Sequence, residues 1–304
     1  MSQILVVGSL AYDSIKTPAG QVAKTLGGSA NYFSVSASLL SPVRVVGVVG
    51  EDYEAADRKI LQDRRVDLSG MTKLPGKTFH WEGFYDDNLN EAQTLKTELN
   101  VFADFDPTLP ENYRDSKFVF LANIDPLLQL KVLEQVKSPV YTGMDTMNFW
   151  IQSKKSDLLK VLKKVDALLI NEGESKMLTG KSNAIAASKE LLKMGPETVV
   201  IKRGEYGLVL NHRDQGLFLL PAFPIEEVVD PTGAGDTFAG GFFGYLSHVG
   251  TRPTFGDLKK ACLAGSCMAS FTVQDFGLKG LLKVDEKALK NRQDFYQKHL
   301  IVGS

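Results

Sequence analysis

The chain has 304 residues, of which 43% are hydrophobic and 23% are charged, and its formal net charge is -1. These values fit one large globular domain, or one domain with a small appendage, and they argue against a nucleic-acid-binding protein. The spacing of Cys262 and Cys267 predicts no disulfide, and without a basic leader or a membrane-spanning apolar run we expect a cytoplasmic protein that does not bind membranes.

Runs rich in β-branched residues alternate with helical patterns along the chain. We expect strands at 4–10, 43–49, 117–122, 140–144, 167–171 and 199–202, and helices at 30–40, 53–65, 126–136, 156–165, 184–194, 236–249 and 255–273. This alternation predicts a layered α/β fold with a mostly parallel sheet. Because such sheets bind ligands at the carboxyl ends of their strands, the residues that follow each strand are candidate site residues.

The first expected strand runs into Gly8 and is followed by Asp13. The glycines of a dinucleotide-binding G-x-G-x-x-G turn are missing there, which argues against a nicotinamide dehydrogenase. A carboxylate at this place either accepts hydrogen bonds from two neighbouring ligand hydroxyls or belongs to a turn. Gly27 and Gly28 come next, before a helix, where they either let the backbone approach a ligand or form a plain capping turn.

Two segments, 12–26 and 77–105, interrupt the alternation of strands and helices. Both alternate polar residues with apolar or aromatic ones, which predicts solvent-facing antiparallel strands. They form either ordinary hairpins or a flap that covers a ligand. If the segments form a flap, Trp81 is a candidate for an apolar cover over the ligand and Asn100 for a polar contact with it. If they form ordinary hairpins, these residues only support a small sheet.

Two later strands also end in polar residues. Asn171 and Glu174 open a helix, where Glu174 can hold a water-ligated Mg²⁺ and Asn171 can contact phosphate. Acidic residues also occur in first helical turns without such a role. Lys202 is followed by Gly204 and Gly207, an arrangement that suits either nucleotide phosphates beneath a base or a simple hairpin turn.

The segment 229–241, with the sequence VDPTGAGDTFAGG, is the most informative part of the chain. Its centre, Gly233-Ala234-Gly235, can turn the chain into a helix whose first N–H groups are unpaired and bind phosphate. Asp236 follows, and its carboxylate either caps the helix or takes a proton from a substrate. The helix continues with the small residues Ala239, Gly240, Gly241 and Gly244. Since glycine weakens a helix, we expect another element or a ligand very close to that backbone.

Taken in order, these motifs resemble those of the PfkB, or ribokinase-like, carbohydrate kinases over nearly the whole chain. The matching positions are Gly8, Asp13, Gly27-Gly28, Asn171-x-x-Glu174, Lys202-x-Gly204-x-x-Gly207 and Asp230-Pro231-Thr232-Gly233-Ala234-Gly235-Asp236. The resemblance implies one ribokinase-like domain over 1–304: a three-layer α/β/α sandwich with a mostly parallel central sheet. It also implies a small β-strand lid formed by 12–26 and 77–105. The activity implied is phosphorylation of a hydroxyl on a small sugar or sugar-like acceptor by ATP with Mg²⁺.

The resemblance also implies a role for each motif. Asp236 corresponds to the catalytic base, and the amides of Gly233, Ala234 and Gly235 correspond to the anion hole. The nucleotide, phosphate and Mg²⁺ positions are Asn171, Glu174, Lys202, Gly204 and Gly207, with Mg²⁺ held by Glu174 through water. The acceptor positions are Asp13, Gly27 and Gly28, to which we add Asn31, Tyr32, Trp81 and Asn100 as candidates. A monovalent cation such as K⁺ corresponds to Asp230, Thr232 and Gly277.

One position departs from the family pattern. The family usually has an asparagine where this chain has Tyr32, and Asn31 stands one residue earlier. This departure concerns the acceptor rather than the reaction. Because no arginine accompanies Lys16 and Lys24 in the flap, we expect an uncharged sugar or riboside rather than a sugar phosphate.

Other functions stay open at this point. A nucleoside kinase is the main alternative, since the same scaffold accepts ribosides and aromatic flap residues can stack on a base. A sugar- or nucleotide-sensing protein without catalysis is less compatible with Asp236, because a pure binder has no use for a carboxylate beside its phosphate site. A P-loop kinase is excluded, since no G-x-x-x-x-G-K-[ST] occurs. A homodimer that forms through the flap is compatible with the sequence.

Overall fold

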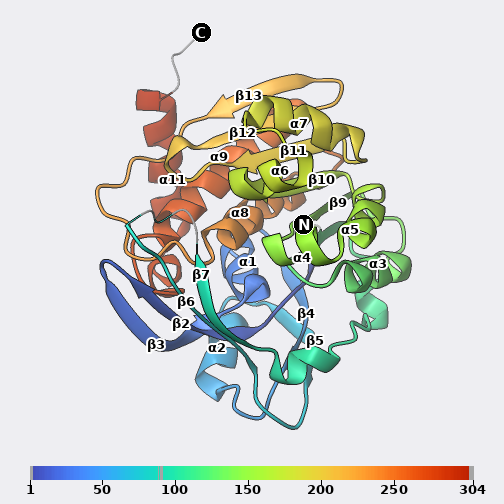
Figure 1. Ribbon diagram of the computed structural model, residues 1–304, viewed down its shortest axis with the longest axis vertical. Helices are drawn as coiled ribbons and strands as arrows, with labels where there is room; N and C mark the ends of the chain where they lie inside the picture. The colour runs from blue at the N-terminus through green and yellow to red at the C-terminus, as the bar shows by residue number, and fades with distance from the viewer. Residues whose placement is uncertain (1–2, 88, 90–91, 301–304) are drawn as a thin grey trace.

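The computed structural model describes residues 3–87, 89 and 92–300 (Figure 1). A 9-stranded sheet forms its centre. In spatial order its strands are β13 (Gly216–Leu220), β12 (Leu208–His212), β11 (Thr198–Lys202), β10 (Ala167–Asn171), β9 (Tyr141–Met144), β8 (Phe118–Leu121), β1 (Ile4–Val7), β4 (Val43–Val49) and β5 (Asp67–Lys73). The strands from β11 to β5 are parallel, and β12 and β13 extend the sheet as antiparallel strands.

Helices cover both faces of this sheet (Figure 1). One face carries α1 (Ser29–Ala37), α2 (Ala55–Asp63), α8 (Ala234–Val249), α9 (Phe255–Thr272), α10 (Lys279–Leu282) and α11 (Glu286–Phe295). The other carries α3 (Pro126–Gln135), α4 (Asn148–Ser153), α5 (Lys155–Leu162), α6 (Glu172–Thr179) and α7 (Ala184–Lys193). The remaining helical elements are short. They are the 3₁₀ helices η1 (Asn100–Asp104), η2 (Glu111–Tyr113) and η3 (Gly204–Tyr206) and the π-helix η4 (Tyr296–Leu300). The predicted three-layer α/β/α fold is therefore confirmed.

The strands of the parallel core were predictable because both of their faces are covered. Every residue of β1 is buried, and its apolar side chains divide between the hydrophobic cores on the two faces. The predicted strand 4–10 ends earlier, at Val7, because the chain leaves the sheet there and begins a new strand at Ala11. We did not predict β5, since its mixed polar sequence reflects its place at the sheet edge.

A 4-stranded sheet projects from the carboxyl edge of the large sheet, in the order β3 (Gly20–Gly27), β2 (Ala11–Thr17), β6 (Phe79–Phe84) and β7 (Gln93–Glu98). The two interrupting segments supply it, as the predicted β-strand lid requires. We expected antiparallel pairing, but β2 and β6 run parallel. They continue from β1 and β5, which run in one direction and leave the large sheet at the same edge.

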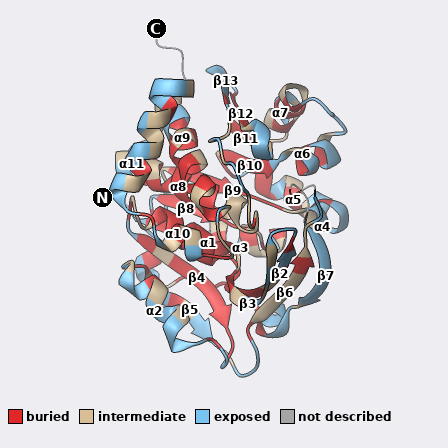
Figure 2. Ribbon diagram, turned by 90° about the vertical axis from the view of Figure 1, so that its left-hand side faces the viewer, coloured by how far each residue is buried: buried red, intermediate tan, exposed pale blue. Residues whose placement is uncertain are grey.

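The glycines of α8 allow this helix to touch its neighbours backbone to backbone. A Cβ atom on Gly240 would lie 2.4 Å from the Phe33 carbonyl oxygen in α1, and one on Gly241 would lie 3.0 Å from the Ala264 carbonyl oxygen in α9. The interior of this layer is correspondingly buried (Figure 2). The expected close partner of the small-residue helix face is therefore a pair of helices.

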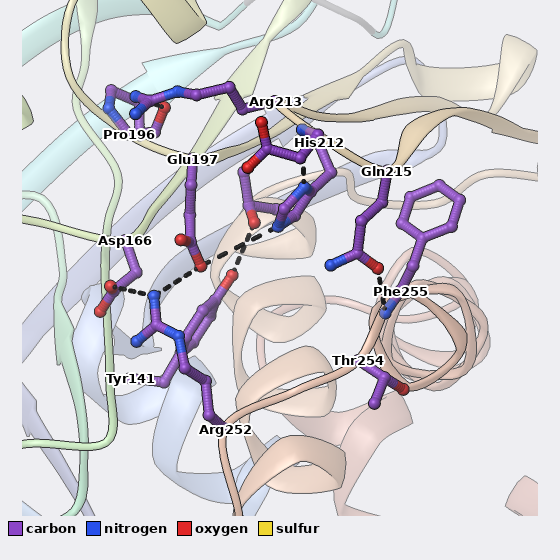
Figure 3. Close-up of polar contacts among 12 residues, drawn as sticks. Tyr141, Asp166, Pro196, Glu197, His212, Arg213, Gln215, Arg252, Thr254 and Phe255 are labelled. Atoms are coloured by element: carbon purple, nitrogen blue, oxygen red, sulfur yellow. Dashed lines mark hydrogen bonds and ion pairs between the residues drawn. The ribbon is translucent and has the colours of Figure 1, made fainter.

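An ion-pair network fastens the chain that follows α8 to the edge of the sheet opposite the small sheet. Arg252 contacts Asp166 at 3.0 Å and Glu197 at 2.8 Å, and these residues directly precede β10 and β11 (Figure 3). Its guanidinium also lies over the ring of Tyr141, at the start of β9. The carboxyl end of α8 is thereby held at one edge of the sheet, and its amino end lies at the other.

Two further properties concern the chain as a whole. Cys262 and Cys267 are buried and free. Among the helices of the described residues, none combines the length and the apolar character needed to cross a membrane.

We predict that Gly240→Ala lowers the free energy of unfolding by about 1–3 kcal/mol, since the added methyl group forces two backbones apart. Gly256→Ala in the exposed first turn of α9 is the matched control, because a Cβ atom there would lie 3.6 Å from its nearest neighbour and alanine favours a helix. Chemical denaturation of both variants checks this. Equal stability of the two variants would contradict the packing described for α8.

Candidate active site

The polar residues expected to act together lie at the carboxyl ends of the parallel strands. Asn171 and Lys202 end β10 and β11, and they are partners in the register of the sheet. Helices α1 and α8 begin at this same edge (Figure 1). Their N-cap residues, Gly28 and Gly233, have φ values of 88° and 72°, which glycine adopts without strain.

The turn before α8 leaves several amide groups free. The Ala234 N–H donates to the Pro231 carbonyl at 3.2 Å, and the Thr237 N–H donates to the Gly233 carbonyl at 2.8 Å. Among the described residues, no hydrogen bond uses the N–H groups of Gly233, Gly235 or Asp236. A helix of 16 residues adds its dipole to these amides, so the turn suits an anion. From the sequence we expected the Ala234 amide in the anion hole, but in the structure this N–H already makes a hydrogen bond within the turn.

The Asp236 side chain is partly exposed at the first turn of α8. Within the described part of the chain its carboxylate accepts no hydrogen bond, so it does not cap the helix. Burial raises the pKa of Asp236 to about 6, while the nearby ammonium group of Lys202 opposes the rise. A carboxylate with this pKa is ionised at neutral pH and sufficiently basic to assist a proton transfer.

Lys202 reaches from β11 to the turn. A Cβ atom on Gly235 would lie 2.8 Å from the Lys202 Nζ atom, so the absence of a side chain makes room for the ammonium group. The same charge lowers the pKa of three carboxyl groups that burial otherwise raises. These groups belong to Asp145, Glu174 and Asp236. Lys202 is thus the cation at the centre of an acidic cluster.

Asn171 and Glu174 form a capping box at the start of α6. The Glu174 N–H donates to the Asn171 side-chain oxygen at 2.8 Å, and the Asn171 N–H donates to the Glu174 carboxylate at 2.9 Å. The plain capping role and the expected ligand role therefore fall on the same two side chains. One Glu174 oxygen holds the cap, and the other is left for a ligand.

Asp145 belongs to this cluster, and sequence reasoning missed it. It follows β9 directly and is buried, and one of its carboxylate oxygens has no hydrogen-bond partner among the described residues. Burial, and then the charge of Asp236, raise its pKa well above the ordinary range. The hydroxyl of the next residue, Thr146, is also buried and unpartnered. The signal that could have found Asp145 was its place directly after the predicted strand 140–144.

Asp13 and the glycine pair form the other end of the site. The Asp13 carboxylate lies against Gly27, where a Cβ atom would come 1.9 Å from its Oδ2 atom, and it accepts a hydrogen bond from the Gly28 N–H. Burial, followed by the negative charges of Asp230 and Asp236, raises the pKa of Asp13 to about 8. Gly27 is therefore required by the carboxylate packed against it, and Gly28 by its positive φ and by the Ser9 carbonyl oxygen, which a Cβ atom there would approach to 2.6 Å.

Tyr32 and Trp81 also lie at this end. The Tyr32 ring packs against Gly233, since a Cβ atom there would lie 2.4 Å from the ring. Trp81 is the register partner of Asp13 in the small sheet, so both side chains lie on one face. Its indole lies across Gly83, and its N–H donates to the Thr94 hydroxyl at 3.1 Å. The indole is held flat on the sheet face that carries Asp13.

Two other acceptor candidates make structural hydrogen bonds instead. Asn31 donates to the Gly27 carbonyl at 2.6 Å and accepts from the Tyr53 hydroxyl at 3.4 Å. Asn100 donates to the Thr78 carbonyl at 3.0 Å. Each side chain therefore already holds a turn of the protein, and a contact of either residue with an acceptor stays a prediction.

The three positions expected to hold a monovalent cation are joined through one carboxylate. Asp230 accepts hydrogen bonds from the Thr232 N–H and the Gly277 N–H, each at 2.9 Å, and it is almost fully buried. It connects two loops that both contact the small sheet, since a Cβ atom on Gly277 would lie 2.4 Å from the Thr25 hydroxyl oxygen. Thr17 donates to the Val229 carbonyl at 2.7 Å.

The glycines after β11 shape the remaining wall. Gly204 and Gly207 both have positive φ, and a Cβ atom on Gly207 would lie 2.0 Å from the Leu220 carbonyl oxygen. Beside them Arg203 pairs with Glu172 at 2.9 Å, which ties this turn to the start of α6. The turn itself therefore requires Gly207, whereas Gly204 adopts a left-handed conformation that favours glycine.

A depression of about 550 Å³ lies away from these residues and is lined in part by Lys189, Lys193 and Arg213. The Arg213 guanidinium donates to three carbonyl groups at the end of α7, including that of Pro196 (Figure 3). Lys193 pairs with Glu190 at 2.8 Å. The charges of Arg213 and Lys193 are therefore already used, which leaves Lys189 to attract an anion in this depression.

Comparisons with known proteins agree with this geometry. Residues 1–283 match the family described as pfkB family carbohydrate kinase. The chain is 34% identical over 254 residues to the cytidine kinase of Thermococcus kodakarensis, covering 82% of this chain and 90% of that protein. It is 28% identical over 289 residues to the inositol 3-kinase of Arabidopsis thaliana, covering 90% of this chain and 75% of that protein.

A solved structure shares the fold. The ribokinase of Arabidopsis thaliana complexed with ribose and ATP superposes with a TM-score of 0.74 at 22% identity, covering 97% of this chain and 99% of that chain. At this level of identity the likeness concerns the fold alone.

The raised pKa of Asp13 predicts a pH-dependent stability. Because this pKa moves from 3.8 to about 8 on folding, the folded protein binds the proton more tightly, and the free energy of unfolding falls as pH rises through that window. Asp13→Asn should therefore be more stable than the unmodified protein at pH 8 and gain less at pH 5. Denaturation at both pH values checks this, and an equal difference at both would contradict the burial of a titrating Asp13.

Proposed function

The chain belongs to the pfkB family of carbohydrate kinases, and we propose that it transfers the γ-phosphoryl group of ATP to a hydroxyl of an uncharged sugar, cyclitol or nucleoside. One observation carries the proposal: unpaired amides, a free carboxylate and an ammonium group meet at the start of α8. The amides are those of Gly233 and Gly235, the carboxylate is Asp236 and the ammonium group is Lys202. Phosphoryl transfer needs these parts, because it depends on positioning and charge stabilisation.

Asp236 is the proposed base. Its carboxylate takes the proton of the acceptor hydroxyl as the hydroxyl oxygen attacks phosphorus, and the bond from phosphorus to the ADP oxygen breaks. The free carboxylate and the pKa of about 6 support this role. The same features speak against a sensor without catalysis, since helix capping does not use this side chain.

The amides of Gly233 and Gly235 are the proposed anion hole. They are fixed by the turn and the helix before any substrate binds, so they need no reorganisation as charge develops on the phosphoryl oxygens. In other enzymes one such donor lowers the barrier by about 3 kcal/mol. Lys202 adds a positive charge beside Gly235, where it neutralises phosphate oxygens.

The residues present fit Mg²⁺. Asp145 has a buried carboxylate oxygen without a partner among the described residues, and Glu174 has one oxygen that its capping box does not use. Mg²⁺ binds through one or two carboxylates, keeps several waters and takes its other ligands from phosphates, so this pair with ATP suffices. When bound, Mg²⁺ offsets the negative charge of the phosphates. Without it, Lys202 is the cation that balances these carboxylates.

The acceptor class follows from the other end of the site. Asp13 can accept hydrogen bonds from hydroxyls, and the flat indole of Trp81 on the same sheet face can cover a ring. A nucleoside is the second candidate, supported by the likeness to a cytidine kinase and by the indole, on which a base can stack. Free sugars and cyclitols are supported by the likeness to an inositol kinase.

Three further expectations remain predictions. Asp230, Thr232 and Gly277 are joined by hydrogen bonds, which supports a shared role for them near a monovalent cation such as K⁺. A homodimer through the small sheet and a cytoplasmic location rest on the sequence alone.

We predict that Asp236→Asn lowers kcat by at least about a thousandfold while ATP binding stays within about twofold, since the amides and Lys202 are unchanged. The measurement is acceptor-dependent ADP release with cytidine, myo-inositol, D-ribose and ribose 5-phosphate, together with calorimetric titration of ATP. Asp166→Asn, at the opposite edge of the sheet, is the control for a general effect of losing a carboxylate.

Either of two results would contradict the proposal. The first is unchanged turnover in Asp236→Asn. The second is the absence of ADP release with every uncharged acceptor in a broad panel of sugars, cyclitols and nucleosides.

We further predict that Asp145→Asn raises the Mg²⁺ concentration required for half-maximal activity by about tenfold, because one carboxylate of the pair is lost. The binding of Mn²⁺ to the ATP-bound variant, followed by electron paramagnetic resonance, gives a readout that does not depend on turnover. Asp125→Asn is the control, since this residue caps α3 and pairs with Lys154. Equal metal affinity in both variants would remove Asp145 from the site.

A further inference from the structure

The hydroxyl of Tyr32 is an unusual group in this protein. The side chain is 1% exposed, and among the described residues its hydroxyl has no hydrogen-bond partner. A buried polar group without a partner costs free energy, so most such groups in proteins are paired. Its persistence here requires a reason, and a ligand hydrogen bond is one.

The ring of Tyr32 fixes where this hydroxyl lies. Tyr32 is in the first turn of α1, and the face of its ring covers Gly233, the N-cap of α8. That face is therefore not available to stack on a ligand. Because the whole residue is 1% exposed, the hydroxyl is the polar atom that it can offer to a ligand, and the position of this atom is tied to the anion-binding turn on which the ring rests.

The groups around the hydroxyl are acidic or phenolic. After burial itself, the charges of Asp13, Asp230 and Asp236 and the phenol of Tyr85 raise the pKa of Tyr32. Burial and two of the same carboxylates raise the pKa of Asp13. No cationic group is among the main causes in either case. A negatively charged acceptor would therefore be repelled here, whereas a neutral one that brings hydroxyl donors is favoured.

A count of donors and acceptors gives the same result. Asp13 accepts a backbone hydrogen bond from Gly28, and its carboxylate retains further lone pairs. Tyr85, which follows β6, accepts from the Thr232 hydroxyl at 3.3 Å, so its own proton is free. Tyr32 and Tyr85 thus offer two O–H donors beside the Asp13 carboxyl group, which accepts hydrogen bonds in its protonated and in its ionised form. Adjacent hydroxyls of a sugar or cyclitol ring both donate and accept, and they complement this set.

We propose that Tyr32 selects the acceptor: its hydroxyl donates a hydrogen bond to an oxygen of an uncharged polyol ring whose hydroxyls donate to Asp13. This inference rests on the proposed function and deepens it. The ring of Tyr32 transmits the contact to Gly233, so an acceptor that makes it is positioned against the anion-binding turn. Acceptors that carry a phosphate, or that lack the contacted hydroxyl, are poor substrates for the same reason.

The test is Tyr32→Phe, which keeps the ring on Gly233 and removes only the hydroxyl. With the best of cytidine, myo-inositol and D-ribose as acceptor, we expect KM for the acceptor to rise about tenfold, with KM for ATP unchanged. Deoxy analogues of that acceptor locate the contact. The analogue that lacks the contacted hydroxyl loses about tenfold with the unmodified protein and loses nothing further with Tyr32→Phe.

Stability provides a second readout. Because the Tyr32 hydroxyl has no partner among the described residues, its removal should leave Tm unchanged or raise it. Tyr141→Phe is the matched control, since Tyr141 is equally buried and its hydroxyl contacts Thr198 at 2.8 Å. We expect a lower Tm for that variant and an unchanged KM for the acceptor.

The outcomes separate this inference from the function on which it rests. If no uncharged acceptor supports ADP release, the proposed function fails, and the inference fails with it. If an acceptor is phosphorylated but Tyr32→Phe leaves its KM unchanged, or lowers Tm as Tyr141→Phe does, only the role of Tyr32 is wrong. Efficient turnover of ribose 5-phosphate would also overturn the selection of uncharged acceptors.

Discussion

The unpaired first turn of α8 is the feature on which the rest of the site depends. Its amides stay free because Gly233 has a positive φ and directs the chain into the helix before any earlier carbonyl can pair with the amides of Gly235 and Asp236. The turn is held from three directions. Tyr32 covers Gly233, Lys202 lies over Gly235, and Gly240 fixes the helix against α1. A side chain at Gly233 or Gly235 would collide with Tyr32 or Lys202, and one at Gly240 would collide with the backbone of α1.

This arrangement gathers several carboxyl groups where few cations balance them. Burial raises the pKa of Asp13, Asp145, Glu174 and Asp236, and the charge of Lys202 opposes the rise at the last three of these residues. The site is therefore less stable when empty than a neutral core would be, and it gains most from ligands that bring positive charge or hydrogen-bond donors. A metal at the Asp145 end and a polyol at the Asp13 end meet these two needs separately.

Features that local chemistry determines were predictable from the sequence. Features that depend on the direction of a side chain, or on residues far apart in the chain, were not. The buried strands and the glycine turn at 233–235 were predictable, because apolar runs and positive φ values leave few alternatives. That the Ala234 amide is already used was not predictable, since it depends on the turn that this amide closes with the Pro231 carbonyl. Asn31 has the right residue type at nearly the right place, yet its amide turns to a backbone carbonyl. Asp145 was missed because a single acid after a strand has no motif around it.

The most direct test of the account is the position of the terminal phosphate in a crystal structure with a non-hydrolysable ATP analogue, Mg²⁺ and an acceptor. We predict that its oxygens lie about 2.7–3.2 Å from the amide nitrogens of Gly233 and Gly235, with the acceptor hydroxyl beside Asp236. A phosphate bound instead in the depression lined by Lys189, Lys193 and Arg213, or a turn whose amides contact only water, would contradict it.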